Sequence, residues 1–167
     1  MEAALHLGFL AVVHDPQGYQ GGLLVTNGWG RPLEFRLTTP LQPTRVHQIL
    51  YGATLRPHLF ADVLGKALLD KAATPLSLIL VNAAELLELR RHTAWPVGWV
   101  QSTAPTPEAQ GPAADGPERF SVEVHAAFPD DRHALARHLE SLAGSDLLEP
   151  FDRIREALTE ARKRTAA

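Results

Sequence analysis

The sequence predicts one α+β domain with a mainly antiparallel sheet of about six strands, helices packed chiefly on one face, and a C-terminal helical pair. Three observations support this prediction. Several short segments alternate apolar and polar residues, as strands do. Longer segments repeat apolar residues at spacings of three and four, as helices do. The length of 167 residues is that of a single domain with a core of its own.

The first strands are expected in the N-terminal part of the chain. Residues 5–14 are apolar on both alternating sets, which predicts a central strand covered on both faces. Another strand is expected over residues 22–26. In the next one, Leu33, Phe35 and Leu37 alternate with polar residues, so these three side chains are expected to face the core.

A glycine-rich hairpin tip separates these last two strands. The Asn27-Gly28 pair predicts a tight turn, but Pro32 lacks a ladder donor, so a loop longer than two residues or an edge position is expected. Trp29 and Arg31 are residue types enriched at binding hot spots, which makes the tip a candidate partner site. Alternatively, Trp29 folds back onto the sheet.

Two helices are expected next. Thr44 is a good N-cap and Gly52 a good terminator for a short helix. Arg45 and Tyr51 of this segment are further candidate partner contacts. Residues 57–71 have one apolar stripe and are expected to form a longer helix on the sheet.

The apolar run at residues 76–81 predicts a buried strand. Asn82 and Glu85 form a capping-box pattern for a helix that ends near His92. A strand over residues 96–101 then follows a connection long enough for a parallel crossover. Asn82 also follows a buried strand, where α/β sheets commonly bind ligands, so it is the alternative ligand site.

Residues 102–117 have no large apolar side chain and are rich in Pro, Ala and Gly. They are expected to form a flexible loop inserted between two strands of one domain. A strand with one polar face is expected over residues 119–128, followed by a helix. The final helix has apolar residues at spacings of four, three, four and three. Internal packing is the default for this stripe; the alternative makes Phe151, Ile154 and Leu158 partner contacts.

Composition excludes several classes of chemistry. The chain has no cysteine, which excludes disulfides, thiolate catalysis and cysteine-ligated metals and is typical of a reducing cytosol. Its net charge of −3 provides no basic field for nucleic acid. No apolar run has the length of a membrane span, so we expect a soluble cytoplasmic protein without a membrane partner.

No familiar catalytic motif is present. None of the eight histidines is four residues from another, as in a helical zinc motif, and no phosphate-binding or nucleophile-elbow pattern occurs. We therefore expect no catalytic residue, no metal and no cofactor. The alternative is an acid–base face in which His125 and Arg36 lie on neighbouring strands.

Taken together, these features predict a non-catalytic protein-binding or adaptor module of a multi-protein assembly. Its partner is expected to be another protein or a second copy of the chain. The alternative is a small ligand-binding domain or enzyme that uses the Asn82 loop or the polar face around His125.

Overall fold

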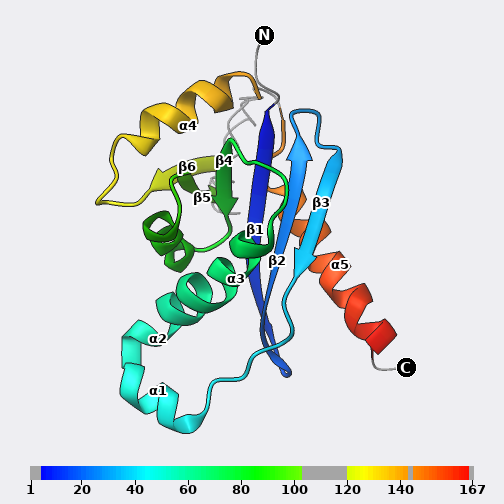
Figure 1. The fold of residues 1–167 in the computed structure, drawn as a ribbon, viewed down its shortest axis with the longest axis vertical. Helices are drawn as coiled ribbons and strands as arrows, with labels where there is room; N and C mark the ends of the chain where they lie inside the picture. The colour runs from blue at the N-terminus through cyan, green and yellow to red at the C-terminus, as the bar shows by residue number, and fades with distance from the viewer. Residues whose placement is uncertain (1–4, 103–119, 143–144, 166–167) are drawn as a thin grey trace, which may run out of the picture.

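The computed structural model describes residues 5–102, 120–142 and 145–165. Six strands form one sheet in the order β3-β2-β1-β4-β5-β6 (Figure 1). The strands are β1 (His6–Asp15), β2 (Gly18–Asn27), β3 (Pro32–Leu37), β4 (Leu78–Val81), β5 (Val97–Ser102) and β6 (Phe120–Val124). Apart from Ser102, the expected loop over residues 102–117 lies outside the described residues.

The sheet is mixed. The β1–β2, β2–β3 and β5–β6 pairs are antiparallel, whereas β1–β4 and β4–β5 are parallel. The prediction of a mainly antiparallel sheet was therefore wrong. The parallel pairs arise because the long connection after β3 carries the chain back across the sheet. β4 therefore pairs with β1 on the side opposite β2, and not with β3 as another antiparallel strand. The parallel β4–β5 pair agrees with the crossover expected from the sequence.

Helical segments connect the strands. They are α1 (Arg45–Tyr51), η1 (Gly52–Thr54), α2 (Leu55–Pro57), η2 (His58–Gly65), α3 (Lys66–Lys71), η3 (Ala84–His92), α4 (Asp131–Glu140) and α5 (Glu149–Thr165). The helix expected over residues 57–71 is present, with a π-helical first part. The connection after β4 is a 3₁₀ helix whose N-cap is Ala83. Within the described residues, no helix is both long enough and apolar enough to cross a bilayer.

Helices cover both faces of the sheet (Figure 1). On one face, η2, α3 and η3 pack on a core that includes Leu10 and Val12 of β1. On the other, α4 and α5 pack on a core that includes Phe9 and Ala11 of the same strand. The central strand was thus predicted correctly, but the placement of helices chiefly on one face was wrong. A strand apolar on both sides needs cover on both sides.

The two C-terminal helices share a face but lie over different strands. α4 packs against β5 and β6, and α5 packs against β1 and β2. Each helix therefore buries its apolar stripe on the sheet, and the structure does not clearly show the helical pair that the sequence predicts. The ring of Phe151 meets the ring of Phe9 edge-on at 5.7 Å. Arg162 anchors the end of α5 through Asp15 and through a 2.6 Å bond from its Nε to the side-chain oxygen of Gln20.

The edge strand β3 has the opposite burial from that expected. Leu33, Phe35 and Leu37 are 44, 36 and 45% exposed. Their side chains lie on the α5 face, but α5 covers β1 and β2 and leaves β3 open. Glu34, on the other face, accepts backbone hydrogen bonds from Ala73 and Thr74. The alternation was predicted correctly, but the expectation that the apolar set faces the core was wrong.

Gly65 marks a close approach between η2 and η3. A Cβ atom at this position would lie 2.7 Å from Cδ2 of Leu89 and 2.8 Å from the carbonyl oxygen of Phe60. A larger residue would push the two segments apart, which explains why a glycine stands inside a helical stretch despite its cost of about 1 kcal/mol relative to alanine.

Candidate interaction surface

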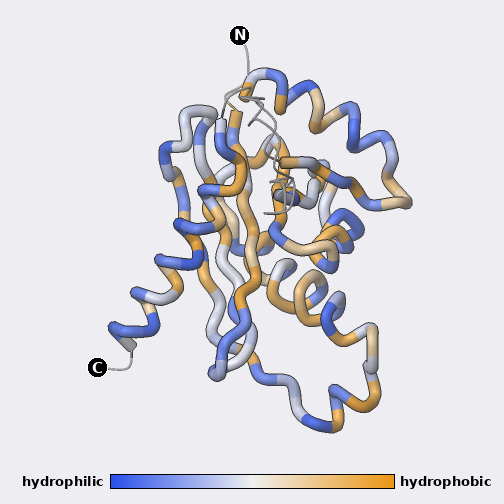
Figure 2. Tube along the Cα trace, turned by 180° about the vertical axis from the view of Figure 1, so that it is seen from behind, coloured by the Kyte–Doolittle hydropathy of each residue, from blue (hydrophilic) through white to orange (hydrophobic). Residues whose placement is uncertain are grey.

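The segment around α1 loops away from the sheet (Figure 1). Thr44 caps α1 by accepting a hydrogen bond from the amide of His47 at 3.1 Å, and Gly52 ends it with a φ of 53°. This confirms both expected helix boundaries. Although α1 is a well-formed helix, none of its residues is buried. Figure 2 shows hydrophobic colour in this projecting segment, away from the body of the protein.

Three apolar side chains of α1 lie in solvent. Val46, Ile49 and Leu50 are 60, 65 and 75% exposed. Their spacing of three and four residues places them on one side of the helix. We call these three residues the α1 face. A helix normally turns such an apolar stripe toward a core, so this face is an exposed apolar surface that the described fold does not use.

The rest of the projecting segment is braced by its own contacts. The ring of Tyr51 stacks on His58 at 4.6 Å and meets His47 edge-on at 6.1 Å. Arg45 donates a long hydrogen bond of 3.4 Å to the side chain of Gln48. Tyr51 and Arg45, both expected as partner contacts, therefore border the α1 face, and Tyr51 also holds the turn that presents it.

The segment is also cationic. Residues 35–61 contain no aspartate or glutamate, and their charged residues are Arg36, Arg45 and Arg56. Arg56 pairs with Glu85 at 3.2 Å on the body of the protein. The charge beside the α1 face is therefore that of Arg45, which favours an acidic counterpart.

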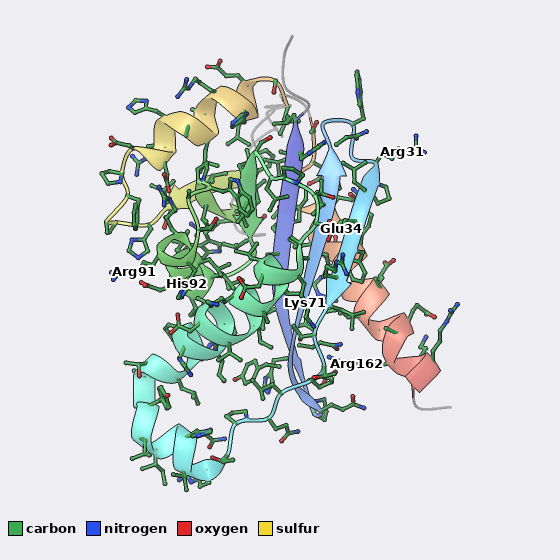
Figure 3. The ribbon with its side chains drawn as sticks, viewed as in Figure 1. Arg31, Glu34, Lys71, Arg91, His92 and Arg162 are labelled. Atoms are coloured by element: carbon green, nitrogen blue, oxygen red, sulfur yellow. The ribbon has the colours of Figure 1, made fainter. Side chains whose placement is uncertain are left out.

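The hairpin tip exposes its tryptophan. The amide of Asn27 donates to the carbonyl of Arg31 at 3.0 Å, and Gly30 closes the turn with a φ of 82°. This is a three-residue loop with glycine in the left-handed position, longer than a two-residue turn, as expected. Trp29 is 93% exposed and does not fold back onto the sheet. Arg31 points away from the start of β3 (Figure 3).

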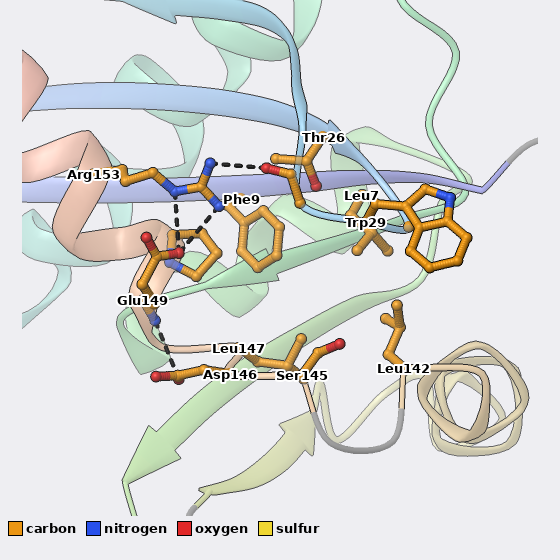
Figure 4. Close-up of a pocket in the computed structure, with 13 residues that line it drawn as sticks. Leu7, Phe9, Thr26, Trp29, Leu142, Ser145, Asp146, Leu147, Glu149 and Arg153 are labelled. Atoms are coloured by element: carbon orange, nitrogen blue, oxygen red, sulfur yellow. Dashed lines mark hydrogen bonds and ion pairs between the residues drawn. The ribbon is translucent and has the colours of Figure 1, made fainter.

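A groove of about 420 Å³ lies between this tip and the start of α5 (Figure 4). Leu7, Phe9 and Leu147 form an apolar part of its lining. Thr26 also lines the groove, and its buried hydroxyl oxygen has no hydrogen-bond partner in the described part of the chain. The groove thus has the chemistry to receive an apolar group next to Trp29.

The charged groups of the groove form contacts within the protein. Arg153 donates to the carbonyl of Gly30 at 2.9 Å and to the carboxylate of Glu149 at 3.1 Å. Asp146 accepts hydrogen bonds from the amides of Leu148 and Glu149 and so caps α5. These contacts fix the tip against α5.

The C-terminal stripe lies inside the protein. Phe151, Ile154 and Leu158 belong to the core on the α5 face and are almost completely buried. These three residues are therefore not exposed to a partner while α5 stays on the sheet. They pack inside the protein, as the first of the two readings of the sequence expects.

The residues of the alternative ligand site are far apart or engaged. Arg36 lies on β3 and His125 follows β6, at opposite edges of the sheet, so they do not form one acid–base face. His125 is buried between the carboxylate of Glu88 at 2.9 Å and the amide of Ala127 at 3.0 Å. Asn82 exchanges hydrogen bonds with the backbone of Val12. The prediction that Asn82 caps the following helix was wrong, because its side chain is used by β1 and the N-cap is Ala83.

One exposed cluster joins two histidines to a carboxylate. His92 and His58 contact Asp62 at 2.8 and 3.2 Å. The hydrogen bond from His92 lowers the pKa of Asp62 against the opposing effect of desolvation, and His58 adds to the decrease. Across the described ranges, no group of three His, Cys, Asp or Glu residues is arranged to hold a metal ion.

Sequence reasoning named the α1 segment but missed its principal residues. It selected Arg45 and Tyr51, whereas the exposed apolar side chains are those of the α1 face. The signal that could have found them is the apolar spacing over Val46, Ile49 and Leu50 in a stretch with no acidic residue.

No protein-family model matches the chain, and no curated protein or solved structure matches it either.

Proposed function

We propose that this chain is a non-catalytic protein-interaction module of a multi-protein assembly and that it binds its partner through the α1 face. The observation that carries the proposal is a capped helix with no buried residue and three apolar side chains in solvent. Arg45 and Tyr51 contribute at the border of this face.

The isolated chain leaves the apolar side chains of the α1 face in solvent. Burying an aliphatic side chain contributes roughly 1.5–3 kcal/mol, and the isolated chain gains little of this at three neighbouring positions. A partner groove that covers the α1 face recovers that free energy on binding. Because α1 is already capped and braced by the Tyr51–His58 stack, little of the gain is lost in ordering it.

The partner's chemistry follows from the charge of the segment. The α1 face is apolar, Arg45 lies beside it, and residues 35–61 have no acidic residue. The matching surface is an apolar groove bordered by carboxylates. The exposed Trp29 at the tip is a second contact point, at the opposite end of the neighbouring strands from α1 (Figure 1).

The proposal is tested by affinity capture from the native host with the double variant Ile49→Ser and Leu50→Ser. Both side chains are mainly exposed, so the variant is expected to keep its unfolding midpoint within about 2 °C of the parent. Loss of the apolar contacts is expected to reduce capture of a stoichiometric protein partner at least tenfold.

The matched control is Leu33→Ser with Leu37→Ser, which removes two exposed leucines from a different surface. It is expected to retain capture, and so to exclude a general effect of surface hydrophobicity. Retention of the partner by the α1 variant, or equal loss in both variants, contradicts the proposal.

A further inference from the structure

Among the described residues, no strand pairs with the outer edge of β3. The strand is the last one in the sheet, next to β2. Its exposed apolar side chains lie on one face, and the charged side chains of Glu34 and Arg36 lie on the other. An edge strand of this kind is a template on which another strand can pair.

The backbone groups that face outward can be assigned from the ladder. Thr38 donates to the carbonyl of Gly21 at 3.0 Å, and the pairing continues through Arg36 opposite Leu23 and Glu34 opposite Val25. Hydrogen-bonding groups alternate in direction along an antiparallel strand. The amides and carbonyls of Phe35 and Leu37 therefore point away from β2, whereas a register shift between Val25 and Thr26 places Leu33 at a bulge, beyond the regular ladder.

We propose that β3 pairs with β3 of a second copy of this chain, antiparallel and centred on Phe35, to form a two-fold symmetric dimer with a continuous sheet. The order Leu33, Glu34, Phe35, Arg36, Leu37 is self-complementary about its centre. Phe35 faces Phe35. Glu34 and Arg36, which already pair at 2.7 Å within each strand, face the Arg36 and Glu34 of the other copy, so four charges of alternating sign meet across the axis. A two-fold interface requires this kind of self-complementary surface.

The charged side chains favour the register centred on Phe35 over the registers centred on adjacent residues. A two-fold axis normal to the sheet keeps each side chain on its own face only if the axis passes through a residue. The neighbouring registers to compare with Phe35 are therefore those centred on Glu34 and on Arg36. Centring on Glu34 places two glutamates opposite each other, and centring on Arg36 places two arginines there. Like charges directly opposite are destabilising, whereas opposite charges stabilise a strand pair.

A comparison with the other edge of the sheet also favours β3. The other edge strand, β6, has Glu123 and no basic residue over Phe120–Val124, so it lacks the same complementarity.

The absence of cysteine from the chain allows a direct test of the register. Phe35→Cys places the two thiols opposite each other at the symmetry axis, within the Cα separation that a disulfide spans. Mild oxidation is expected to convert this variant to a dimer of twice the 18.2 kDa chain mass. Light scattering of the parent protein is expected to give the same doubled mass at high concentration.

The control is the same substitution at the neighbouring outward position. Leu37→Cys is expected to remain uncrosslinked, because each thiol lies four residues from its symmetry mate. A monomeric parent with no crosslink in Phe35→Cys, or crosslinking of Leu37→Cys, overturns the proposal. Circular dichroism of each variant verifies that it is folded.

Arg36→Glu tests the charge argument separately. It replaces the Arg36–Glu34 pair within each strand and the pairs across the axis by like charges, and is expected to weaken dimerisation by at least roughly tenfold while circular dichroism shows a folded chain. The Ile49→Ser and Leu50→Ser variant is expected to dimerise like the parent, because α1 lies outside the β3 edge. Loss of the dimer and loss of partner capture are therefore distinguishable.

Discussion

Replacing Ile154 by alanine is expected to lower the free energy of unfolding by about 2–5 kcal/mol. Its side chain is fully buried in the core between α5 and the sheet. It packs so closely on β2 that a Cβ atom added at Gly22 would lie 2.6 Å from its Cγ2 atom. Removing its outer atoms therefore leaves a cavity at the centre of this contact.

The matched control is the same change in the projecting helix, Ile49→Ala. That side chain is mainly in solvent, so its loss is expected to cost less than about 0.5 kcal/mol. Urea unfolding of the two variants measures both values. Equal small effects would contradict the docking of α5, and equal large effects would contradict the exposure of α1.

Glu34→Gln is expected to lower the free energy of unfolding by about 2 kcal/mol at pH 7, after allowance for solvent screening. The carboxylate of Glu34 accepts hydrogen bonds from the amides of Ala73 and Thr74 and from Arg36, at 2.7–3.1 Å. Desolvation acts to raise the pKa of Glu34, but these hydrogen bonds outweigh it and lower the pKa to about 2 from 4.5. They connect β3 to the loop after α3.

The pH dependence follows from the sign of this shift. Because the pKa of Glu34 is lower in the folded protein, its stabilisation is fully present above about pH 5 and disappears as the pH falls toward 2. The parent and Glu34→Gln should therefore differ most at neutral pH and converge in acid. Glu123→Gln, on the opposite edge strand, serves as the exposed control. A difference between parent and Glu34→Gln that stays constant from pH 7 to 2 would contradict this role.

Local patterns predicted much of the fold. The two apolar sets of β1, the Thr44 cap and the Gly52 terminator each depend on residues close in sequence, and the structure contains all three features. The order of strands depends on long-range packing. The sequence did not show that β4 would pair with β1 in parallel, and this pairing determines which strands stand at the edges.

The same limit explains the errors about the site. Whether Leu33 and Phe35 are buried depends on which strands α5 covers, and whether Ile49 is buried depends on where α1 lies relative to the sheet. Neither can be read from periodicity. Arg36 and His125 could form the alternative site only if their strands were neighbours. In the observed strand order, they lie at opposite edges of the sheet.

The most direct test of the α1 face as a binding surface is the reactivity of a single thiol at its centre. Ile49→Cys introduces the only thiol of the chain, and Arg137→Cys on α4 is the exposed control. In the isolated protein, both thiols are expected to react rapidly with a maleimide. In the complex isolated from the host, the thiol at position 49 is expected to react at least tenfold more slowly while the control is unchanged. Slow reaction at position 49 in the isolated protein, or equal reaction in both states, would contradict the α1 face as the interaction surface.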